Sequence, residues 1–117
     1  MTISAHFSRS EFACKCGCGF DTVDIETLSV LEEIRQHFGQ PVWINSGCRC
    51  SYYNAKVGGA VASQHIRGRA ADIEVAHTEP AQVYQFLNSE YPNKYGIGVY
   101  SDFIHIDTRS EKARWRG

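Results

Sequence analysis

Two histidines and two aspartates, carried by two short segments, have the types and spacing of a catalytic metal site. His65 is followed seven residues later by Asp72, which leads into an apolar segment. In the second segment, Asp102 precedes His105 by three residues. Two imidazoles and one carboxylate are a known ligand set for catalytic zinc, with the fourth position left for water. Because a further carboxylate nearby can act as the base on that water, the pattern predicts a zinc hydrolase.

A wider pattern surrounds these residues. It comprises Ile44-Asn45-Ser46-Gly47-Cys48-Arg49, then Asn54 and Gly58-Gly59, then Ser63-x-His65-x-x-Gly68-x-Ala70-x-Asp72, and finally Ile104-His105-Ile106-Asp107. From about residue 28 to residue 109, the chain resembles the zinc D-alanyl-D-alanine carboxypeptidase family, whose peptidoglycan metallopeptidases include phage L-alanyl-D-glutamate and DD-endopeptidase endolysins. The resemblance implies a hedgehog-like, DD-peptidase-like fold and a single zinc peptidase domain over residues 1–117.

The resemblance also implies a role for each matching residue. His65, Asp72 and His105 would hold one zinc ion. Asp102 stands where the family carries its acidic catalytic base. Arg49 matches the arginine that binds substrate or steadies the oxyanion, since a planar guanidinium suits a carboxylate as well as a developing alkoxide.

Three other residues lie in or beyond this pattern. Asp107 matches a family position that orients a ligand histidine or a neighbouring loop. Ser63 either hydrogen-bonds the substrate or holds the metal loop, and the sequence leaves both open. Trp115 lies among basic residues near the C-terminus. We expect it to pack the tail onto the domain rather than to flank a substrate groove.

Alternation along the strands predicts where the ligands face. Residues 71–76 alternate as a strand that places Asp72 on its polar side. Farther on, Ile104 and Ile106 are expected to point into the core, so His105 faces the opposite side. Residues three apart on a regular strand face opposite sides, so the backbone before Phe103 must turn or bulge if Asp102 is to reach the metal.

The elements that position the site follow from periodicity and capping. A capping box predicts a short helix at residues 8–11, and a helix beginning at Asp24 is stopped by Gly39 and Pro41. The other predicted elements are a strand at 41–45, a helical turn at 51–56, a strand at 71–76, a helix from Thr78, and a hairpin of 98–100 with 103–107. Without regular βαβ alternation, we expect an α+β fold with helices packed on a small antiparallel sheet.

Five cysteines fall in two groups: Cys14, Cys16 and Cys18, then Cys48 and Cys50. Three interpretations stay open. The cysteines are plain reduced thiols, a disulfide joins the two groups, or four thiolates hold a second, structural zinc. A reducing compartment weakens the disulfide interpretation.

Composition excludes some functions. The chain has 117 residues, 43% of them hydrophobic, and a formal net charge of -1. This size suits one domain, and the charge gives no footprint for nucleic-acid binding. No apolar run could span a membrane, and the N-terminus does not have the pattern of a secretory signal. We expect a monomer of bacterial or phage origin. It would be made in the cytoplasm and act on the bacterial cell wall.

These observations predict a zinc metallopeptidase that hydrolyses peptidoglycan stem peptides or cross-links. The bond stays open between D-Ala-D-Ala carboxypeptidase activity, cleavage of a D-Ala cross-link, and L-Ala-D-Glu endolysin activity, with an endopeptidase preferred. The alternative from another class is a non-catalytic zinc-containing module of the same fold that binds the cell wall or another ligand. Asp102 and Arg49 favour the enzyme.

Overall fold

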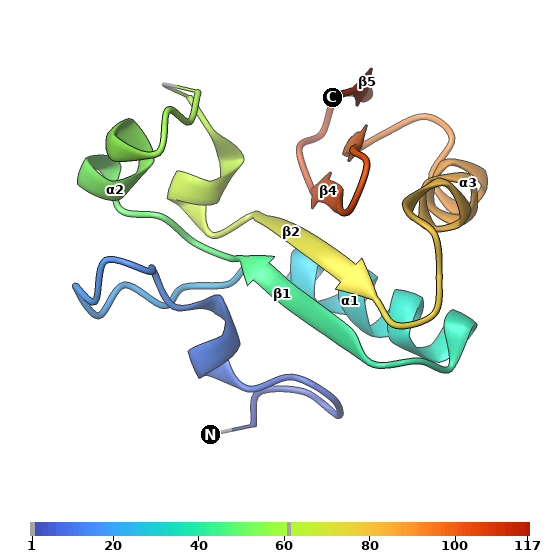
Figure 1. The fold of residues 1–117 in the computed structure, drawn as a ribbon, viewed down its shortest axis with the longest axis horizontal. Helices are drawn as coiled ribbons and strands as arrows, with labels where there is room; N and C mark the ends of the chain where they lie inside the picture. The colour runs from blue at the N-terminus through green and yellow to red at the C-terminus, as the bar shows by residue number, and fades with distance from the viewer. Residues whose placement is uncertain (1, 61) are drawn as a thin grey trace.

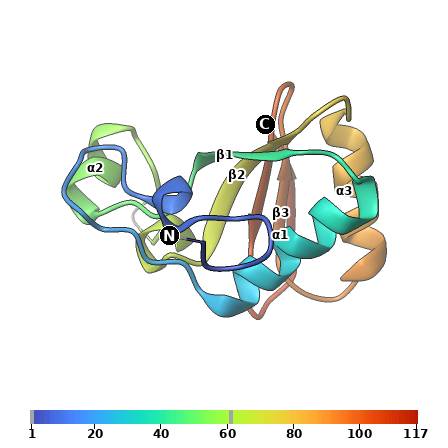
Figure 2. The ribbon, with the colours of Figure 1, turned by 90° about the horizontal axis from the view of Figure 1, so that it is seen from below.

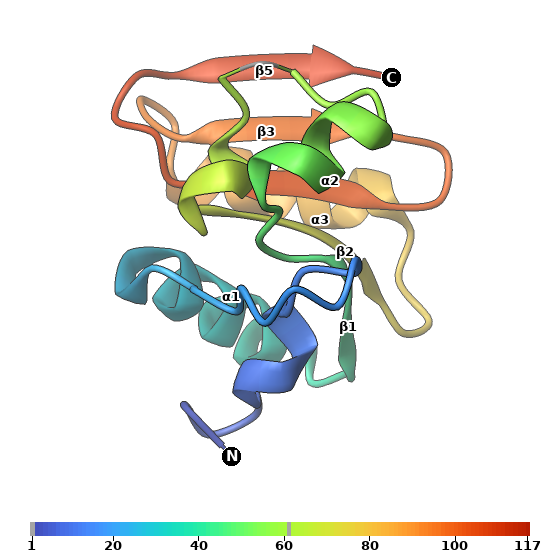
Figure 3. The same cartoon turned by 90° about the vertical axis from the view of Figure 1, so that its left-hand side faces the viewer.

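The computed structural model describes residues 2–60 and 62–117. Its elements, in chain order, are the 3-10 helix η1 (Arg9–Phe12), helix α1 (Ile25–Phe38), strand β1 (Val42–Ser46), helix α2 (Ser51–Lys56), the 3-10 helix η2 (Gln64–Arg67), strand β2 (Ala70–Val75), helix α3 (Pro80–Glu90), and strands β3 (Gly96–Val99), β4 (Ile104–Asp107) and β5 (Ala113–Arg116). Helix α2 and η2 lie on one side of the sheet and α3 lies on the other (Figures 1 and 3). The predicted α+β class is confirmed.

The five strands form one sheet in the order β1-β2-β4-β3-β5. The first three pairings are antiparallel, whereas β5 runs parallel to β3. The prediction of a purely antiparallel sheet was therefore wrong at this edge. Both sides of β4 are already occupied by β2 and β3. The strand that returns after β4 pairs at the outer edge of β3, where its direction is parallel.

Helix α1 begins and ends at the residues that its sequence signals indicated. The side chain of Asp24 accepts a hydrogen bond from the backbone N–H of Glu26, which caps the first turn. Gly39 ends the helix in the left-handed conformation, with φ of 63°. Between these caps, Leu31 and Ile34 are completely buried and attach the helix to the core.

One face of the sheet forms the core and the other carries the polar residues. Ile73, Ile97, Ile104 and Ile106 belong to a buried cluster that also includes side chains of α1 and α3. The opposite face is organised as a row of register partners, one from each strand. This cross-strand row consists of Ser46, Asp72, His105, Gly98 and Trp115.

The segment before α1 packs against the rest of the domain, beside the chain that leads into α2 (Figure 2). Phe7 and Phe12 bury their rings there, each with 1% of the residue exposed. A Cβ atom on Gly47 would lie 2.6 Å from the Cα of Phe12, so this contact requires glycine. No helix among the described residues has both the length and the apolar character needed to cross a membrane.

Candidate metal centre

Three side chains converge on the polar side of the sheet. His65, Asp72 and His105 each offer a ligand atom, and these atoms all lie within 4.8 Å of one another. Asp72 Oδ1 lies 2.9 Å from His105 Nδ1 and 3.4 Å from His65 Nε2. Asp72 and His105 are direct neighbours on β2 and β4, while His65 comes from η2. The fold therefore brings together the three ligands that the sequence pattern predicted.

The loop around His65 fixes which of its nitrogens faces the other ligands. Ser63 caps η2, because its Oγ accepts a hydrogen bond from the backbone N–H of His65 at 3.1 Å. The ring Nδ1 of His65 lies 2.6 Å from the carbonyl oxygen of Gly47 and can donate to it. That hydrogen bond selects the tautomer whose Nε2 carries the lone pair. Ser63 thus serves the loop-holding role that the sequence left open.

Asp107 fixes which nitrogen of His105 faces the other ligands. Its carboxylate is completely buried, and Oδ2 lies 2.7 Å from His105 Nε2. Arg109 donates to both oxygens of Asp107, each at 2.8 Å, and the backbone N–H of Gly96 donates to Oδ1 at 3.2 Å. With Nε2 held in this way, Nδ1 of His105 is left to face Asp72. With the backbone N–H of Arg109, which donates to Oδ1 at 3.2 Å, the carboxylate that holds the histidine is itself held by four donors.

The two carboxylates in this group are ionised. Burial raises the pKa of Asp72, but hydrogen bonds with His105 and His65 outweigh burial, and the pKa lies well below its usual range. The pKa of Asp107 is also well below its usual range, because hydrogen bonds from His105 and Arg109 outweigh its burial. A metal ligand must be deprotonated, so Asp72 is ready to bind a cation.

Arg49 holds the second oxygen of the Asp72 carboxylate. Its Nη2 donates to Asp72 Oδ2 at 3.3 Å, and only 15% of its side chain is exposed. The guanidinium is fixed from two other directions, by Ser46 Oγ and by Asn54 Oδ1, each at 3.3 Å. A Cβ atom on Gly59 would lie 2.1 Å from Asn54 Oδ1, so the neighbouring loop leaves room for this arrangement. Arg49 thereby directs Oδ1 of Asp72 toward the two histidines.

The donor set fits zinc. Two imidazole nitrogens and a carboxylate oxygen converge, and the far nitrogen of each histidine has its own hydrogen-bond acceptor, as is usual for zinc-bound histidines. A profile of the family described as Peptidase M15 matches residues 5–107, which include all three ligands. The chain belongs to the Peptidase M15 family. No curated protein matches the sequence.

Peptidase M15 proteins are zinc-dependent, and in this member the ligand group lies in a cavity of about 560 Å³. Such a volume is typical of small-ligand sites. Beyond the three ligands, the cavity is lined by residues from the loop before η2, by Arg49 and Ser63, and by a wall of larger side chains: Tyr100, Phe103, Arg109 and Trp115. The predicted substrate residues Arg49 and Ser63 therefore both face the same cavity as the metal ligands.

The position of Trp115 differs from the sequence prediction. Its indole lies over Gly98, where a Cβ atom would be 2.3 Å from Nε1. The ring centroid is 5.1 Å from that of His105, and Nε1 donates to the hydroxyl of Tyr100 at 2.9 Å. Trp115 thus forms a wall of this Peptidase M15 cavity rather than only packing the tail. The glycine opposite His105 was the sequence signal that could have indicated it.

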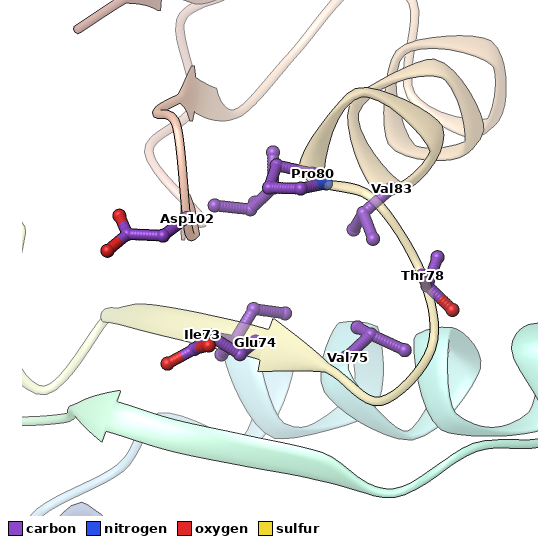
Figure 4. A pocket seen from close by; sticks show the side chains of 8 residues that line it. Ile73, Glu74, Val75, Thr78, Pro80, Val83 and Asp102 are labelled. Carbon is purple, nitrogen blue, oxygen red and sulfur yellow. The ribbon is translucent and has the colours of Figure 1, made fainter.

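Asp102 does not line this cavity. It lies on the bend between β3 and β4, which is closed by a hydrogen bond from Tyr100 N to Phe103 O at 3.0 Å, so the predicted turn before Phe103 is present. Its side chain is exposed and borders a separate small hollow beside Ile73 and Val83. Figure 4 shows its carboxylate pointing away from Val83 and helix α3. Its role as the catalytic base stays a prediction.

The cysteines divide differently from the predicted five-membered group. The sulfur atoms of Cys14, Cys16, Cys18 and Cys50 lie within 4.8 Å of one another. Cys48 is not part of this cluster, because its buried Sγ lies 3.1 Å from the carbonyl oxygen of Phe12 and 3.0 Å from that of Phe20. Its inclusion in the predicted thiol cluster was wrong. Cys48 is held by two backbone carbonyls, whereas the sulfur of Cys50, at the start of α2, lies against that of Cys14.

Proposed function

We propose that this Peptidase M15 member is a zinc peptidase that hydrolyses peptide bonds in the stem peptides or cross-links of bacterial peptidoglycan. The observation that carries the proposal is the convergence of three ligand atoms at a cavity that also presents Arg49. Stem peptides carry carboxylates, at their ends and on D-glutamate, and a guanidinium is the side chain best suited to bind them. The aromatic wall offers apolar surface for the small side chains of such peptides.

The residues of this chain would divide the work as follows. His65, Asp72 and His105 would hold a zinc ion, which would supply an acidified water and an electrophile for the scissile carbonyl. Arg49 binds a substrate carboxylate, while it also keeps Asp72 oriented. Asp102 takes the proton of the attacking water and passes it to the leaving amine.

This role for Asp102 requires a change of side-chain position. Its carboxylate is exposed on a bend and, among the described residues, has no partner that would hold it in the small hollow. Rotation of the side chain therefore costs little energy. Catalytic contacts in a substrate-free site are often long and close only when substrate binds. The wall residue Phe103 follows Asp102 directly, so substrate contact at this wall can be coupled to the rotation.

The position of Asp102 is also what favours a second candidate, a zinc-containing module that binds the cell wall without cleaving it. Such a module needs the ligand set and the cavity but no base at the metal. The two candidates differ in what a substitution of Asp102 should do. It should lower the turnover of a peptidase, and it should have no effect on a binding module.

Digestion of purified peptidoglycan, followed by mass spectrometry of the muropeptides, tests the proposal. The wild type is expected to release products, and a zinc-depleted sample and the His65→Ala/His105→Ala variant are expected to release none. The masses distinguish loss of a terminal D-alanine, opening of a cross-link, and cleavage between L-alanine and D-glutamate. Binding of the wild type to peptidoglycan without any new product would contradict the peptidase and support the binding module.

A further inference from the structure

The cysteine cluster lies apart from the proposed catalytic centre. Three of its residues come from the loop before α1, and the fourth, Cys50, directly precedes α2. Cys16 and Cys18 are exposed, Cys14 is buried, and all the cysteines are free of disulfide bonds. None of these residues lines the cavity that holds His65 and His105.

The sulfur separations have the size expected for a single metal ion. Cys14 Sγ lies 3.5 Å from Cys16 Sγ and 3.8 Å from Cys50 Sγ, and the last two sulfurs are 3.6 Å apart. Zinc–sulfur bonds of about 2.3 Å in a tetrahedron put neighbouring sulfurs about 3.8 Å apart. Cysteines that hold a cluster of several irons bind different metal atoms and need a larger spread. The cluster therefore matches one tetrahedral ion.

The backbone on both sides of the cluster is shaped to bring the sulfurs together. Gly17 and Gly19 adopt positive φ values of 83° and 92°, which let the alternate cysteines of the loop turn toward one point. The loop is closed by a hydrogen bond from Cys14 N to Phe20 O at 2.7 Å. On the other side, Cys50 caps α2, because its Sγ accepts from the backbone N–H of Tyr53 at 3.4 Å.

Backbone donors also point at the sulfurs. Besides the contact from Tyr53, the N–H of Cys50 donates to Cys14 Sγ at 3.4 Å. Such donors stabilise the negative charge of a thiolate, as the partners of metal ligands commonly do. Thiol–thiol contacts alone are weak, so they do not account for four sulfurs gathered at one point.

We propose that Cys14, Cys16, Cys18 and Cys50 bind a second zinc ion as four thiolates, forming a structural site. Binding releases the thiol protons to solvent and changes no oxidation state. Four sulfur ligands leave no open position for water, so this ion has no part in the hydrolysis.

The proposed ion would join the N-terminal loop to the segment that serves the catalytic centre. Cys50 follows Arg49, whose backbone N–H donates to the carbonyl oxygen of His65 at 2.9 Å. Two residues earlier, Gly47 accepts the hydrogen bond from His65 Nδ1. Fixing Cys50 therefore fixes the stretch that orients both a ligand and the guanidinium.

The test counts and characterises zinc in four forms of the chain. Elemental analysis combined with native mass spectrometry is expected to find about two zinc ions in the wild type. We expect about one in Cys16→Ser/Cys50→Ser, about one in His65→Ala/His105→Ala, and about two in the matched control Cys48→Ser. X-ray absorption of the histidine double variant should show four sulfur neighbours at about 2.3 Å. No zinc in the histidine variant, or the same zinc content in Cys16→Ser/Cys50→Ser as in the wild type, would overturn the proposal. Iron bound in place of zinc would overturn the choice of metal.

A measurement on the unmodified chain covers the case in which the cysteine variant does not fold. Cys16 and Cys18 are exposed, so as plain thiols they should react at once with an alkylating reagent. We expect four cysteines to be protected until a chelator or mercurial removes the metal, and then to react. Immediate alkylation of native protein, or a disulfide between any two of the four, would contradict the proposal. Neither the zinc content nor the alkylation depends on peptidase activity. Both tests are therefore independent of the proposed function.

Discussion

Asp107 Oδ2 lies 2.7 Å from His105 Nε2, and this contact decides that His105 faces Asp72 through Nδ1. Both residues sit on β4, two positions apart and on the same side of the strand. The ring is held between the two carboxylates. Its orientation is fixed by its contacts with these two carboxylates.

Removal of this support should weaken metal binding. We expect Asp107→Asn to lower zinc affinity by about 10–100-fold, the usual effect of losing a partner of a ligand histidine. Competition with a chromogenic chelator measures the change, and circular dichroism checks that the variant is folded. Glu74→Gln is the matched control. Glu74 lies on β2 on the same side as the ligand Asp72, but it is exposed and is not a ligand. Equal affinities for Asp107→Asn and wild type would contradict the role of Asp107.

Asp102→Asn separates catalysis from metal binding. It should keep the fold and the zinc but lower kcat by about 10²–10⁴-fold, because proton transfer by a positioned group contributes that much. Steady-state hydrolysis of a purified muropeptide measures the effect, with Ser101→Ala from the same bend as the control. A kcat near that of the wild type in a zinc-replete Asp102→Asn sample would assign the base to another group.

Arg49 is expected to act mainly on substrate binding. Arg49→Lys keeps the charge but loses the planar fork that contacts Asp72, Ser46 and Asn54. Loss of a charged hydrogen bond corresponds to a rise of about 10–100-fold in KM, with kcat changed far less. A kcat that falls by about 10²–10³-fold at constant KM would instead show that the guanidinium steadies the oxyanion.

Gly98→Ala should disturb the aromatic wall. The added Cβ would meet the indole of Trp115, and overpacking of this kind costs about 1–3 kcal/mol of unfolding free energy. Denaturant unfolding measures that loss. The same substitution in a Trp115→Ala background should cost much less, because the clashing group is gone. Equal costs in both backgrounds would show that the contact is not responsible.

A pH effect is expected at the N-terminal segment, away from the metal ligands. Burial raises the pKa of Glu32, but hydrogen bonds from Ser4 and His6 outweigh it, and the pKa is lowered. A carboxyl group with a lowered pKa in the folded state stabilises that state above its ordinary value of 4.5, and the stabilisation is lost as the pH falls through the folded value. Wild type should therefore melt at a higher temperature than Glu32→Gln near neutral pH. The corresponding difference in unfolding free energy is no more than about 1 kcal/mol. The difference should vanish in acid, and a difference independent of pH would contradict this account.

Local patterns in the sequence were sufficient for the ligand-bearing strands. The alternation around Asp72 and His105 predicted their common face, and the caps of α1 lie at Asp24 and Gly39 as expected. Strand β5 was not predicted, because Ala113–Arg116 is only four residues long and half of them are arginines. Its pairing depends on which edge of the finished sheet is free, which no local pattern encodes.

The sulfur cluster illustrates a second limit. The spacing of Cys14, Cys16 and Cys18 indicated a turn, but it did not indicate which later cysteine would meet them. The structure selects Cys50 and turns Cys48 toward backbone carbonyls. That choice follows from the packing of Phe12 against Gly47, a contact between segments far apart in the chain.

The cross-strand row also governs when the site can exist during folding. Asp72, His105, Gly98 and Trp115 come from four strands, and the pairing of β2 with β4 closes a loop of about thirty residues. A slip of one residue in any strand would turn its member of the row toward the core. Asp72 and His105 can therefore meet only after β2 has paired with β4, a slow, non-local step. Zinc uptake at this site during refolding should accordingly report that pairing rather than an early local event.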